Sequence, residues 1–145
     1  MKRKKRMNYK IIGKYIKELK FEIPNAKTFF LLEKNISNYK INIDIKSLRL
    51  KDKIVEVMIA LSLNPTINET DRINTKIVFS TIIEIDSDIV EKNLLEEIIL
   101  IKVPNEIFPE IRSLFILLFE KSGFNKIKIE EKIDFNKLYL KKNLQ

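Results

Sequence analysis

The sequence predicts an α+β fold in which the strands come first and the helices follow. Apolar and polar residues alternate with a period of two in four segments before residue 87. From Leu94 onward the apolar residues recur at the spacing of a helix instead. Proline, asparagine and aspartate mark the joints between segments, as at Pro24-Asn25 and in Asn64–Arg72.

The first expected strand is Tyr15–Glu22, because its apolar and charged residues alternate. The pattern places apolar residues on one face and charged residues on the other: Tyr15, Leu19 and Phe21 against Glu18, Lys20 and Glu22. Pro24-Asn25 ends this strand. Ala26–Ser37 is expected to be an irregular or briefly helical connection that carries Phe29 and Phe30.

The second expected strand begins at Asn38 and has the clearest alternation in the chain. Its isoleucines lie opposite polar residues: Ile41, Ile43 and Ile45 against Asn42, Asp44 and Lys46. Leu48 and Leu50 are out of phase with this pattern, which predicts a bulge or the end of the strand. Arg49–Lys53 is expected to form a turn.

Two further strands are expected at Val55–Leu63 and Thr75–Asp86, where apolar residues again recur at every second position. The second face of each strand is partly apolar as well, as Ala60 and Val78 illustrate. Strands with two apolar faces are typical of sheets that are covered on both sides. We therefore expect both faces of this sheet to be covered.

Helices are expected in the remainder of the chain. Leu94–Ile101 suits a short helix that ends before Pro104. Asn105 is placed to cap the next helix, with Pro109 in its first turn, and Gly123 supplies a left-handed stop. A final helix is expected after Asp134, which is placed as its cap; its inner face would carry Phe135, Leu138 and Tyr139.

The long helix has more apolar surface than one stripe can contain. One stripe has helical spacing and consists of Ile107, Ile111, Leu114 and Leu118, and a second consists of Phe108, Phe115 and Phe119. A helix that is apolar all round must be covered on more than one side. We expect another copy of the chain to supply that cover; the alternative is a central helix in a compact monomer.

Composition excludes several kinds of site. The 145-residue chain has no cysteine and no histidine, and its two glycines are Gly13 and Gly123. Thiolate zinc sites, nucleophiles paired with histidine and glycine-rich phosphate loops are therefore excluded. Asp and Glu pairs remain, but no pattern singles out one of them. We expect a protein that is not an enzyme and that uses no metal and no cofactor.

The basic charge lies largely in a tail. The net charge is +8, and Lys2–Arg6 supplies five of these positive charges. We assign residues 1–10 to a solvated basic tail and residues 11–145 to one domain. A nucleic-acid-binding module that uses the tail is the alternative of a different class, because clustered cations bind phosphates. No apolar stretch approaches the roughly 20 residues that span a bilayer. We therefore expect a cytoplasmic protein without membrane insertion.

Three segments, in register across about residues 11–142, carry a family resemblance. Tyr15–Ala26 combines an aromatic residue, an acidic residue, Phe-Glu and then Pro-Asn-Ala. Pro104–Pro109, followed by Arg112, looks like the start of a long helix, and Ile133–Tyr139 contains a closing Asp-Phe segment. Together these segments resemble the SecB family of export chaperones.

The resemblance implies a fold, an assembly and a function. The implied fold is a four-stranded antiparallel sheet, with a crossover between its first two strands, followed by helices. The implied assembly is a dimer of dimers, a homotetramer whose oligomer interface would contain Ile107, Ile111, Leu114 and Leu118. The implied function is that of an ATP-independent chaperone, which binds unfolded preproteins and passes them to the SecA motor.

The resemblance also assigns site residues. The acidic positions that dock SecA match Glu18, Glu22 and Glu84. The candidates for the client-binding groove are Phe29, Phe30, Ile41, Ile43, Ile45, Phe108 and Phe115. The chain departs from the family in its basic charge and in its ending, Lys141–Gln145, which has no acidic residue. A close alternative function is a SecB-like chaperone dedicated to one client, such as an antitoxin.

Overall fold

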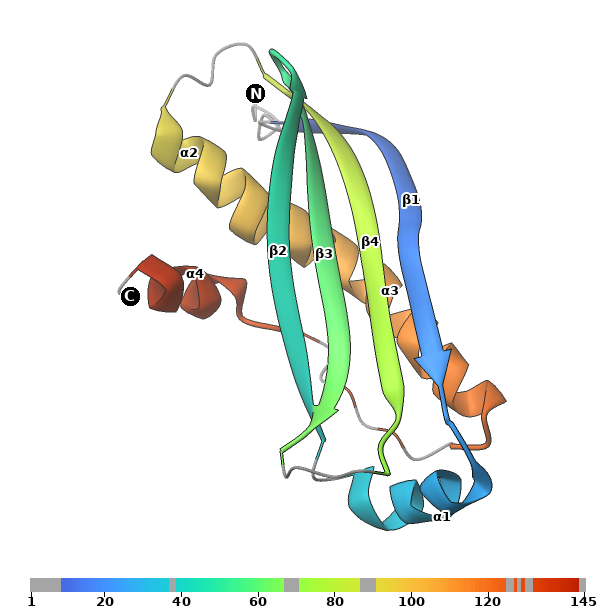
Figure 1. The fold of residues 1–145 in the computed structure, drawn as a ribbon. Helices are drawn as coiled ribbons and strands as arrows, with labels where there is room; N and C mark the ends of the chain where they lie inside the picture. The colour runs from blue at the N-terminus through green and yellow to red at the C-terminus, as the bar shows by residue number, and fades with distance from the viewer. Residues whose placement is uncertain are drawn as a thin grey trace, which may run out of the picture.

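The computed structural model describes residues 9–36, 39–66, 71–86, 91–124, 127, 129 and 132–143; residues 140–143 are described by their backbone alone. Four strands form one antiparallel sheet in the order β1-β4-β3-β2 (Figure 1). Their bounds are β1 (Tyr9–Glu22), β2 (Tyr39–Lys51), β3 (Ile54–Pro65) and β4 (Asn74–Ile85). The expected fold, a four-stranded antiparallel sheet followed by helices, is confirmed.

A helical crossover joins the two edge strands of the sheet. The connection between β1 and β2 forms α1 (Ala26–Asn35), which lies beyond one end of the sheet (Figure 1). Asn25 caps this helix, because its side-chain oxygen accepts hydrogen bonds from the Thr28 backbone N–H at 2.9 Å and from the Thr28 hydroxyl at 3.0 Å. The segment expected to be irregular or briefly helical is thus a regular helix of ten residues.

Two β-bulges change the phase of β1. Its register with β4 shifts between Ile11 and Gly13 and again between Ile16 and Glu18. After the second shift Leu19 pairs with Ile77 on the face toward the helices, whereas Tyr15 pairs with Ser80 on the opposite face. The prediction that Tyr15 shares a face with Leu19 and Phe21 is therefore wrong.

The hairpin between β2 and β3 is tighter than expected. The strand β2 continues to Lys51, and Arg49 still pairs with Val55, so the turn expected at Arg49–Lys53 reduces to Asp52 and Lys53. A register irregularity between Arg49 and Lys51 lies at Leu50, in agreement with the predicted bulge. The ladder is regular through Leu48, which is out of phase because it lies on the face opposite to Ile45.

The helices expected on either side of Pro104 form one continuous helical segment. It consists of α2 (Lys92–Glu97), the π-helical turn η2 (Ile98–Lys102) and α3 (Val103–Lys121). The Val103 N–H donates to the carbonyl of Ile98, five residues back. This wider turn relieves the clash that the Pro104 ring would make in a regular α-helix with the carbonyl four residues earlier. The predicted break before Pro104 is therefore wrong.

Two details of the predicted start of the long helix are wrong for the same reason. Because η2 runs directly into α3, Asn105 lies inside the helix and caps nothing. Pro109 lies inside the helix as well, beyond its first turn. The predicted end is confirmed, since Gly123 follows α3 with a φ of 92°, which favours glycine.

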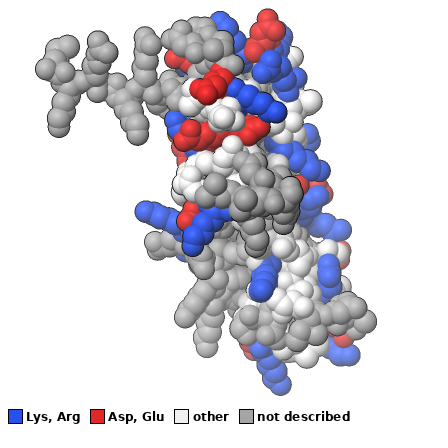
Figure 2. Space-filling view, turned by 90° about the vertical axis from the view of Figure 1, so that its left-hand side faces the viewer, with Lys and Arg blue, Asp and Glu red and all other residues white. Residues whose placement is uncertain are grey.

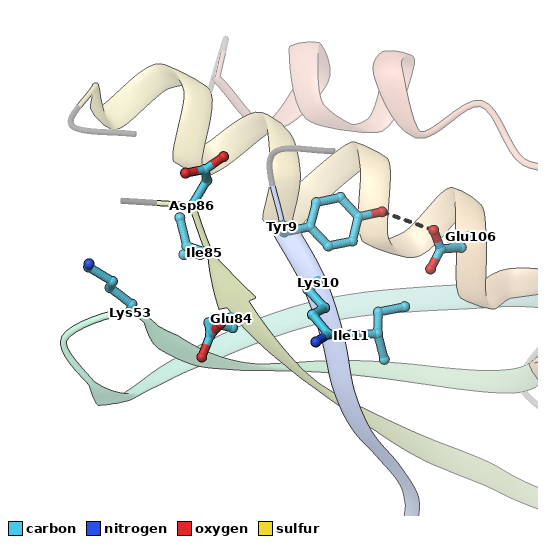
Figure 3. Close-up of a pocket in the computed structure, with 8 residues that line it drawn as sticks. All are labelled: Tyr9, Lys10, Ile11, Lys53, Glu84, Ile85, Asp86 and Glu106. Atoms are coloured by element: carbon cyan, nitrogen blue, oxygen red, sulfur yellow. Dashed lines mark hydrogen bonds between the residues drawn. The ribbon is translucent and has the colours of Figure 1, made fainter. Parts of the chain in front are cut away.

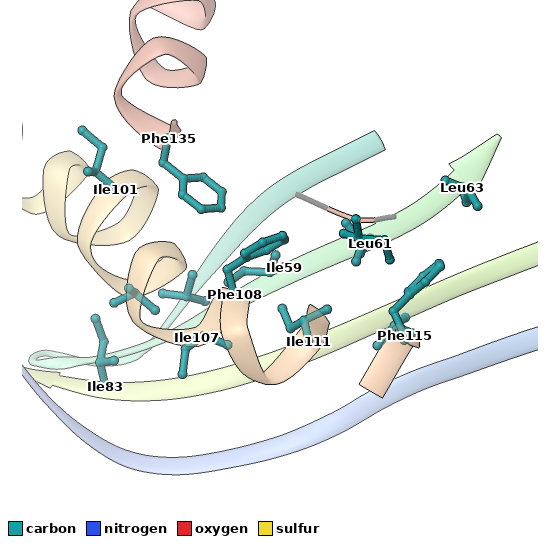
Figure 4. Packing of buried hydrophobic residues seen from close by; sticks show 14 of the residues in the cluster. Ile59, Leu61, Leu63, Ile83, Ile101, Ile107, Phe108, Ile111, Phe115 and Phe135 are labelled. Carbon is teal, nitrogen blue, oxygen red and sulfur yellow. The ribbon is translucent and has the colours of Figure 1, made fainter. Parts of the chain in front are cut away.

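The core lies between the sheet and the helices (Figure 4). One face of β3 and β4 meets α3, and the cluster includes Ile59, Leu61, Ile83, Ile107, Ile111 and Phe115. In the part of the chain that the structure describes, the helices cover this face and leave the other without a helical layer (Figure 1). The expectation that both faces are covered is wrong for these residues. We call the second face the outer face; Met58, Ala60 and Val78 are half-buried on it.

The last helix, α4 (Phe135–Asn143), packs near η2. The Asp134 carboxylate accepts a hydrogen bond from the Lys137 N–H at 3.1 Å, as expected of a cap. Phe135 is buried, and the Tyr139 hydroxyl donates to Glu96 of α2 at 3.0 Å. Leu138, expected on the inner face, is exposed instead.

Candidate functional site

The edge strand β1 exposes an unusual number of apolar side chains. It pairs with β4 on one side, and no described strand pairs with its other side. Ile12, Tyr15, Ile16 and Leu19 are between 43% and 50% exposed. A long edge strand with unpaired backbone groups and exposed apolar side chains is a template for pairing with another chain. Sequence reasoning missed this feature, because periodicity shows which residues alternate and not which strand lies at an edge.

The three acidic residues assigned to SecA docking lie on the outer face of the sheet. Glu18 pairs across the ladder with Val78, and Glu22 pairs with Asn74; Glu84 lies on β4 itself, in phase with both partners. Along the strand direction, Glu22 and Glu84 lie roughly 13 Å and 20 Å from Glu18, at about 3.3 Å per residue. The structure thus places the three carboxylates on one face but does not bring them together.

A shallow hollow of about 620 Å³ opens on the outer face between β1 and β2. Its floor is apolar and includes Met58, Ala60 and Val78. Its charged lining is mixed: Lys17, Lys46, Lys76, Glu18 and Asp44. The Nζ atom of Lys76 lies 3.6 Å from Oε2 of Glu18, and Nζ of Lys46 lies 4.0 Å from Oδ2 of Asp44. The hollow is therefore a surface for apolar contact with charges of both signs at its border.

A buried carboxylate links three strands beside this hollow. Glu56 of β3 accepts hydrogen bonds from the hydroxyls of Tyr15 on β1 and Ser80 on β4. These hydrogen bonds, the Ser80 bond foremost, lower the pKa of Glu56. Sequence reasoning missed this cluster; its one signal was an acidic residue inside the apolar strand Val55–Leu63.

The two aromatic residues of the crossover differ in burial: Phe29 is packed against other rings, and Phe30 is exposed. The Phe29 ring packs on Phe124, with 4.8 Å between the ring centroids. Its Cζ atom lies 3.5 Å from the position that a Cβ atom at Gly123 would occupy. Phe30 packs edge-on against Phe29 at 5.5 Å but is 65% exposed. Of these two groove candidates, Phe30 therefore presents the larger surface to solvent.

The other groove candidates differ in burial. Ile41, Ile43 and Ile45 are half-buried on β2, the second edge strand, on the face toward the helices. Phe108 and Phe115 are buried, with Phe108 against Phe135 at 6.0 Å and Phe115 against Phe119 at 5.5 Å. The assignment of Phe108 and Phe115 to an open groove therefore needs correction: in this structure both rings belong to the core.

The residues assigned to an oligomer interface differ in the same way. Ile107 and Ile111 are buried against the sheet, so these two assignments are corrected to core positions. Leu114 and Leu118 are half-buried, and Leu117, which the apolar stripes did not include, is 46% exposed. The apolar surface that α3 leaves open is thus a narrow strip around Leu117 rather than the whole helix.

Two further hollows lie at the borders of the helical layer. One, of about 750 Å³, lies between α3 and the segment before α4 and is lined by Phe108, Pro109, Arg112, Lys132 and Phe135, among others. The other, of about 740 Å³, lies at the start of β1 (Figure 3). There the Tyr9 hydroxyl donates to Glu106 at 3.3 Å, and burial, with Glu106 nearby, raises the pKa of Tyr9 to about 12.

The described residues offer no arrangement of three or more Asp or Glu side chains that could hold a metal ion. Within the same residues, no helix has the length and apolar content that a membrane span requires. Figure 2 shows Lys and Arg along the whole length of the molecule, with Asp and Glu gathered mainly in the upper part of that view.

Comparison with known proteins identifies the family. The family model of the preprotein translocase subunit SecB matches residues 2–145. A putative protein-export protein SecB of Pelagibacter ubique is 39% identical over 132 residues, which are 91% of this chain and 94% of the relative. A protein-export protein SecB of Rhodospirillum rubrum is 31% identical over 134 residues, covering 89% of this chain and 78% of the relative.

A solved structure has the same fold. A SecB-like chaperone of Mycobacterium tuberculosis, in complex with a ChAD peptide from an antitoxin, superposes with a TM-score of 0.66 at 12% identity. The likeness covers 87% of this chain and 88% of that one. The match of the family model over nearly the whole chain, together with the relatives above 30% identity, shows that the chain belongs to the SecB family of protein-export chaperones.

Proposed function

We propose that the protein holds unfolded preproteins in the cytoplasm without ATP and delivers them to the SecA motor for export. One observation carries this proposal beyond family membership: apolar side chains lie open along strand edges and on the crossover helix. Holding an unfolded chain needs such surface and free backbone groups, and it needs no reaction. The absence of histidine and cysteine from the sequence is in keeping with a binding role.

The client surface is proposed to run from α1 onto β2. The helix α1 leads into β2 after a short connection, so Phe30 and the half-buried isoleucines Ile41 and Ile43 belong to neighbouring parts of the chain. The strand β2 pairs with β3 along one edge, and no described strand pairs with its other edge. The backbone at this free edge can therefore accept an extended segment by strand addition. Backbone pairing tolerates many sequences, as a general chaperone requires.

The chain is proposed to assemble as a homotetramer, a dimer of dimers. The support is the exposed edge of β1, where Ile16 and Leu19 lie on the face toward α3, together with Leu117 on α3. The exposed ion pair between Lys14 of β1 and Glu110 of α3, at 2.9 Å, shows that the two elements lie side by side. A second copy would cover both with one surface and pair the free strand edge.

SecA docking is proposed at Glu18, Glu22 and Glu84 on the outer face. Glu22 and Glu84 are exposed, and Glu18 is half-exposed beside Lys76, so all three are accessible from the same side. Carboxylates spread over one flat face suit an extended basic partner, because complementary charges favour encounter and fix orientation.

The holding function is tested by refolding. An unfolded test protein is diluted into buffer with and without the chaperone at one tetramer per client, in the absence of ATP. We expect refolding and aggregation to slow in proportion to the tetramer concentration, and we expect the native client to be ignored. Unchanged refolding at stoichiometric tetramer would refute the proposal.

A further inference from the structure

A row of four side chains, one from each strand, crosses the outer face of the sheet. Glu18 of β1 pairs with Val78 of β4, which pairs in turn with Ala60 of β3. Asp44 of β2 pairs with Ala60 from the other side. The two carboxylates thus lie at opposite ends of the row, roughly 14 Å apart at about 4.8 Å per strand. The apolar pair between them forms part of the floor of the hollow of about 620 Å³, which we call the outer hollow.

A β-bulge adds a lysine to one end of this row. The register of β1 shifts between Ile16 and Glu18, so Lys17 is the extra residue. The Nζ atom of Lys17 lies 3.3 Å from the sulfur of Met58, and both Lys17 and Glu18 line the outer hollow. Successive residues of a regular strand would point to opposite faces of the sheet. The bulge therefore brings a cation and an anion to the same border of the hollow.

Each carboxylate of the row also has a lysine beside it. Lys76 forms an ion pair with Glu18, and Lys46 lies at the distance limit of an ion pair with Asp44. With Lys17, the outer hollow is lined by three lysines and two carboxylates. Its charge is nearly balanced, and both signs occur on the β1 side as well as on the β2 side.

A segment with charges of a single sign does not fit this arrangement. Cations that reach Glu18 and Asp44 would also meet the lysines beside them, and carboxylates that reach the lysines would meet Glu18 and Asp44. The charges just beyond the hollow do not change the balance, since Lys20 pairs across the ladder with Lys76 and Glu22 follows two residues later. A fitting partner must therefore carry both signs.

We propose that the outer hollow docks a protein segment in which an aliphatic residue lies between charged residues of both signs, and that SecA supplies this segment. The aliphatic side chain covers Ala60 and Val78, while the charged residues take over the ion pairs that line the hollow. Exposed ion pairs contribute little to stability, so their exchange is easy, whereas like charges reject other partners. The inference rests on the proposed docking of SecA to the outer face and deepens it by naming the chemistry of the docking segment.

Replacing the lysines beside the two carboxylates distinguishes a mixed segment from a basic one by the sign of the effect. In Lys46→Glu/Lys76→Glu the outer hollow keeps Lys17 as its one cation among the lining residues. The carboxylates of a mixed segment then meet repulsion, and we expect the affinity for SecA to fall about tenfold. A purely basic segment would bind more tightly instead. Calorimetry with purified SecA, at low and physiological salt, measures the change.

Synthetic peptides test the outer hollow without SecA. Peptides of about ten residues, roughly 33 Å long when extended, are long enough to cross it. They share central leucines and are flanked by lysines only, by glutamates only or by equal numbers of both. We expect the mixed peptide to bind the unchanged chain about tenfold more tightly than either of the others. In Lys46→Glu/Lys76→Glu the lysine peptide should become the preferred one, and a mixed peptide with serines in place of leucines should bind the unchanged chain about tenfold more weakly.

Controls separate the outer hollow from net charge, from client binding and from assembly. Lys34→Glu/Lys121→Glu makes the same change in net charge at exposed lysines of α1 and α3 and should leave the order of the peptides unchanged. Phe30→Ser, in the proposed client surface, should still bind the mixed peptide. Light scattering should give the same solution mass for Lys46→Glu/Lys76→Glu as for the unchanged chain.

Four outcomes would overturn the proposal. Tighter binding of SecA by Lys46→Glu/Lys76→Glu would leave SecA docking in place but assign it to a basic segment. Equal affinity for the three charged peptides would show that the lining charges do not select a partner. Loss of the mixed peptide in Phe30→Ser would assign the peptide to the client surface, and a changed solution mass in Lys46→Glu/Lys76→Glu would assign the hollow to another copy of the chain. Failure of the unchanged chain to bind SecA at all is a distinct result, because it would refute SecA docking itself and this inference with it.

Discussion

The Tyr15 hydroxyl on the edge strand β1 donates to the Glu56 carboxylate on β3, across the intervening strand β4. Ser80 of β4 donates to the same carboxylate. The contact therefore fixes the position of β1, which is joined to the rest of the sheet by a single ladder. It also lies next to the bulge after Ile16, which determines that Glu18 faces outward.

Removing the charge of Glu56 should loosen this link. Glu56→Gln keeps the shape of the side chain but weakens two hydrogen bonds to a buried charged acceptor, so we expect a loss of about 1–3 kcal/mol in the free energy of unfolding. Urea denaturation at neutral pH measures it. Glu120→Gln, at an exposed carboxylate of α3, should stay within about 0.5 kcal/mol of the parent. An equal, small effect of both substitutions would contradict the structural role of Glu56.

The same carboxylate predicts a pH dependence. The pKa of Glu56 is lower in the folded chain than the ordinary value of 4.5. Its stabilisation is therefore fully present above pH 4.5 and disappears as the pH falls from that value through the lowered pKa. The difference in unfolding free energy between the parent and Glu56→Gln should shrink across this window. A difference that stays constant down to the lowest pH at which both chains fold would count against the lowered pKa.

Charge reversal on the outer face should weaken docking selectively. We expect Glu18→Lys/Glu22→Lys to reduce SecA affinity about tenfold, because complementary charge is replaced by repulsion. Binding to purified SecA, measured by calorimetry or interferometry, checks this. Glu33→Lys/Glu120→Lys, on α1 and α3, is the control with the same change in net charge. If both double variants bind SecA equally, the docking assignment is wrong. Client binding should be unchanged in Glu18→Lys/Glu22→Lys, whose two positions lie on the outer face.

The two phenylalanines of the crossover should separate binding from stability. Phe30→Ser removes an exposed ring and should lower the affinity for an unfolded client about tenfold, with little change in unfolding free energy. Phe29→Ala removes a ring that packs on Phe124 and should cost about 2 kcal/mol of stability. Client titration and urea denaturation of both variants measure the two effects. Undiminished client binding by Phe30→Ser would remove this residue from the proposed surface.

Assembly should depend on the exposed face of β1. In Ile16→Lys/Leu19→Lys, two lysines replace apolar side chains that a second copy would cover, so we expect the solution mass to fall from a tetramer to smaller species. Light scattering at micromolar concentration measures the mass. Leu138→Lys, on α4, should leave it unchanged. A double lysine variant that remains tetrameric would place the interface elsewhere.

The sequence predicted β2, β3 and β4 well because their faces differ in polarity. The strand β1 begins at Tyr9, which is buried, so it starts earlier than the expected Tyr15 and includes two residues that were assigned to the basic tail. Ile41, Ile43 and Ile45 lie on one face of β2 as expected, and β3 and β4 agree with their predicted ranges within two residues. The face of Tyr15 was predicted wrongly because a bulge adds one residue to the strand, and periodicity cannot detect an added residue. The position of β1 beside β4 depends on pairing between distant segments, which local patterns do not encode.

The helices show a different limit. Pro104 is ordinarily a reason to end a helix, and only the π-helical turn before it allows the chain to continue. Apolar spacing alone does not tell whether Ile111 and Phe115 pack against the sheet of the same chain or against another copy of the chain. The composition of α3 led to the expectation that another copy of the chain would cover it, but the sheet of the same chain covers both residues.

The strand β1 comes first in the sequence but pairs with β4, the last of the four strands, and this affects how the chain folds during synthesis. Tyr9 pairs with Ile85 and Glu22 with Asn74, so the first strand to leave the ribosome has no neighbour until the fourth has followed. During that interval its apolar residues remain open to other polypeptides. Since loop closure must precede such distant pairing, docking of the N-terminal strand should be the slow event in maturation. Until β4 has been synthesised, a chain with this topology is therefore itself prone to aggregation through the apolar residues of β1.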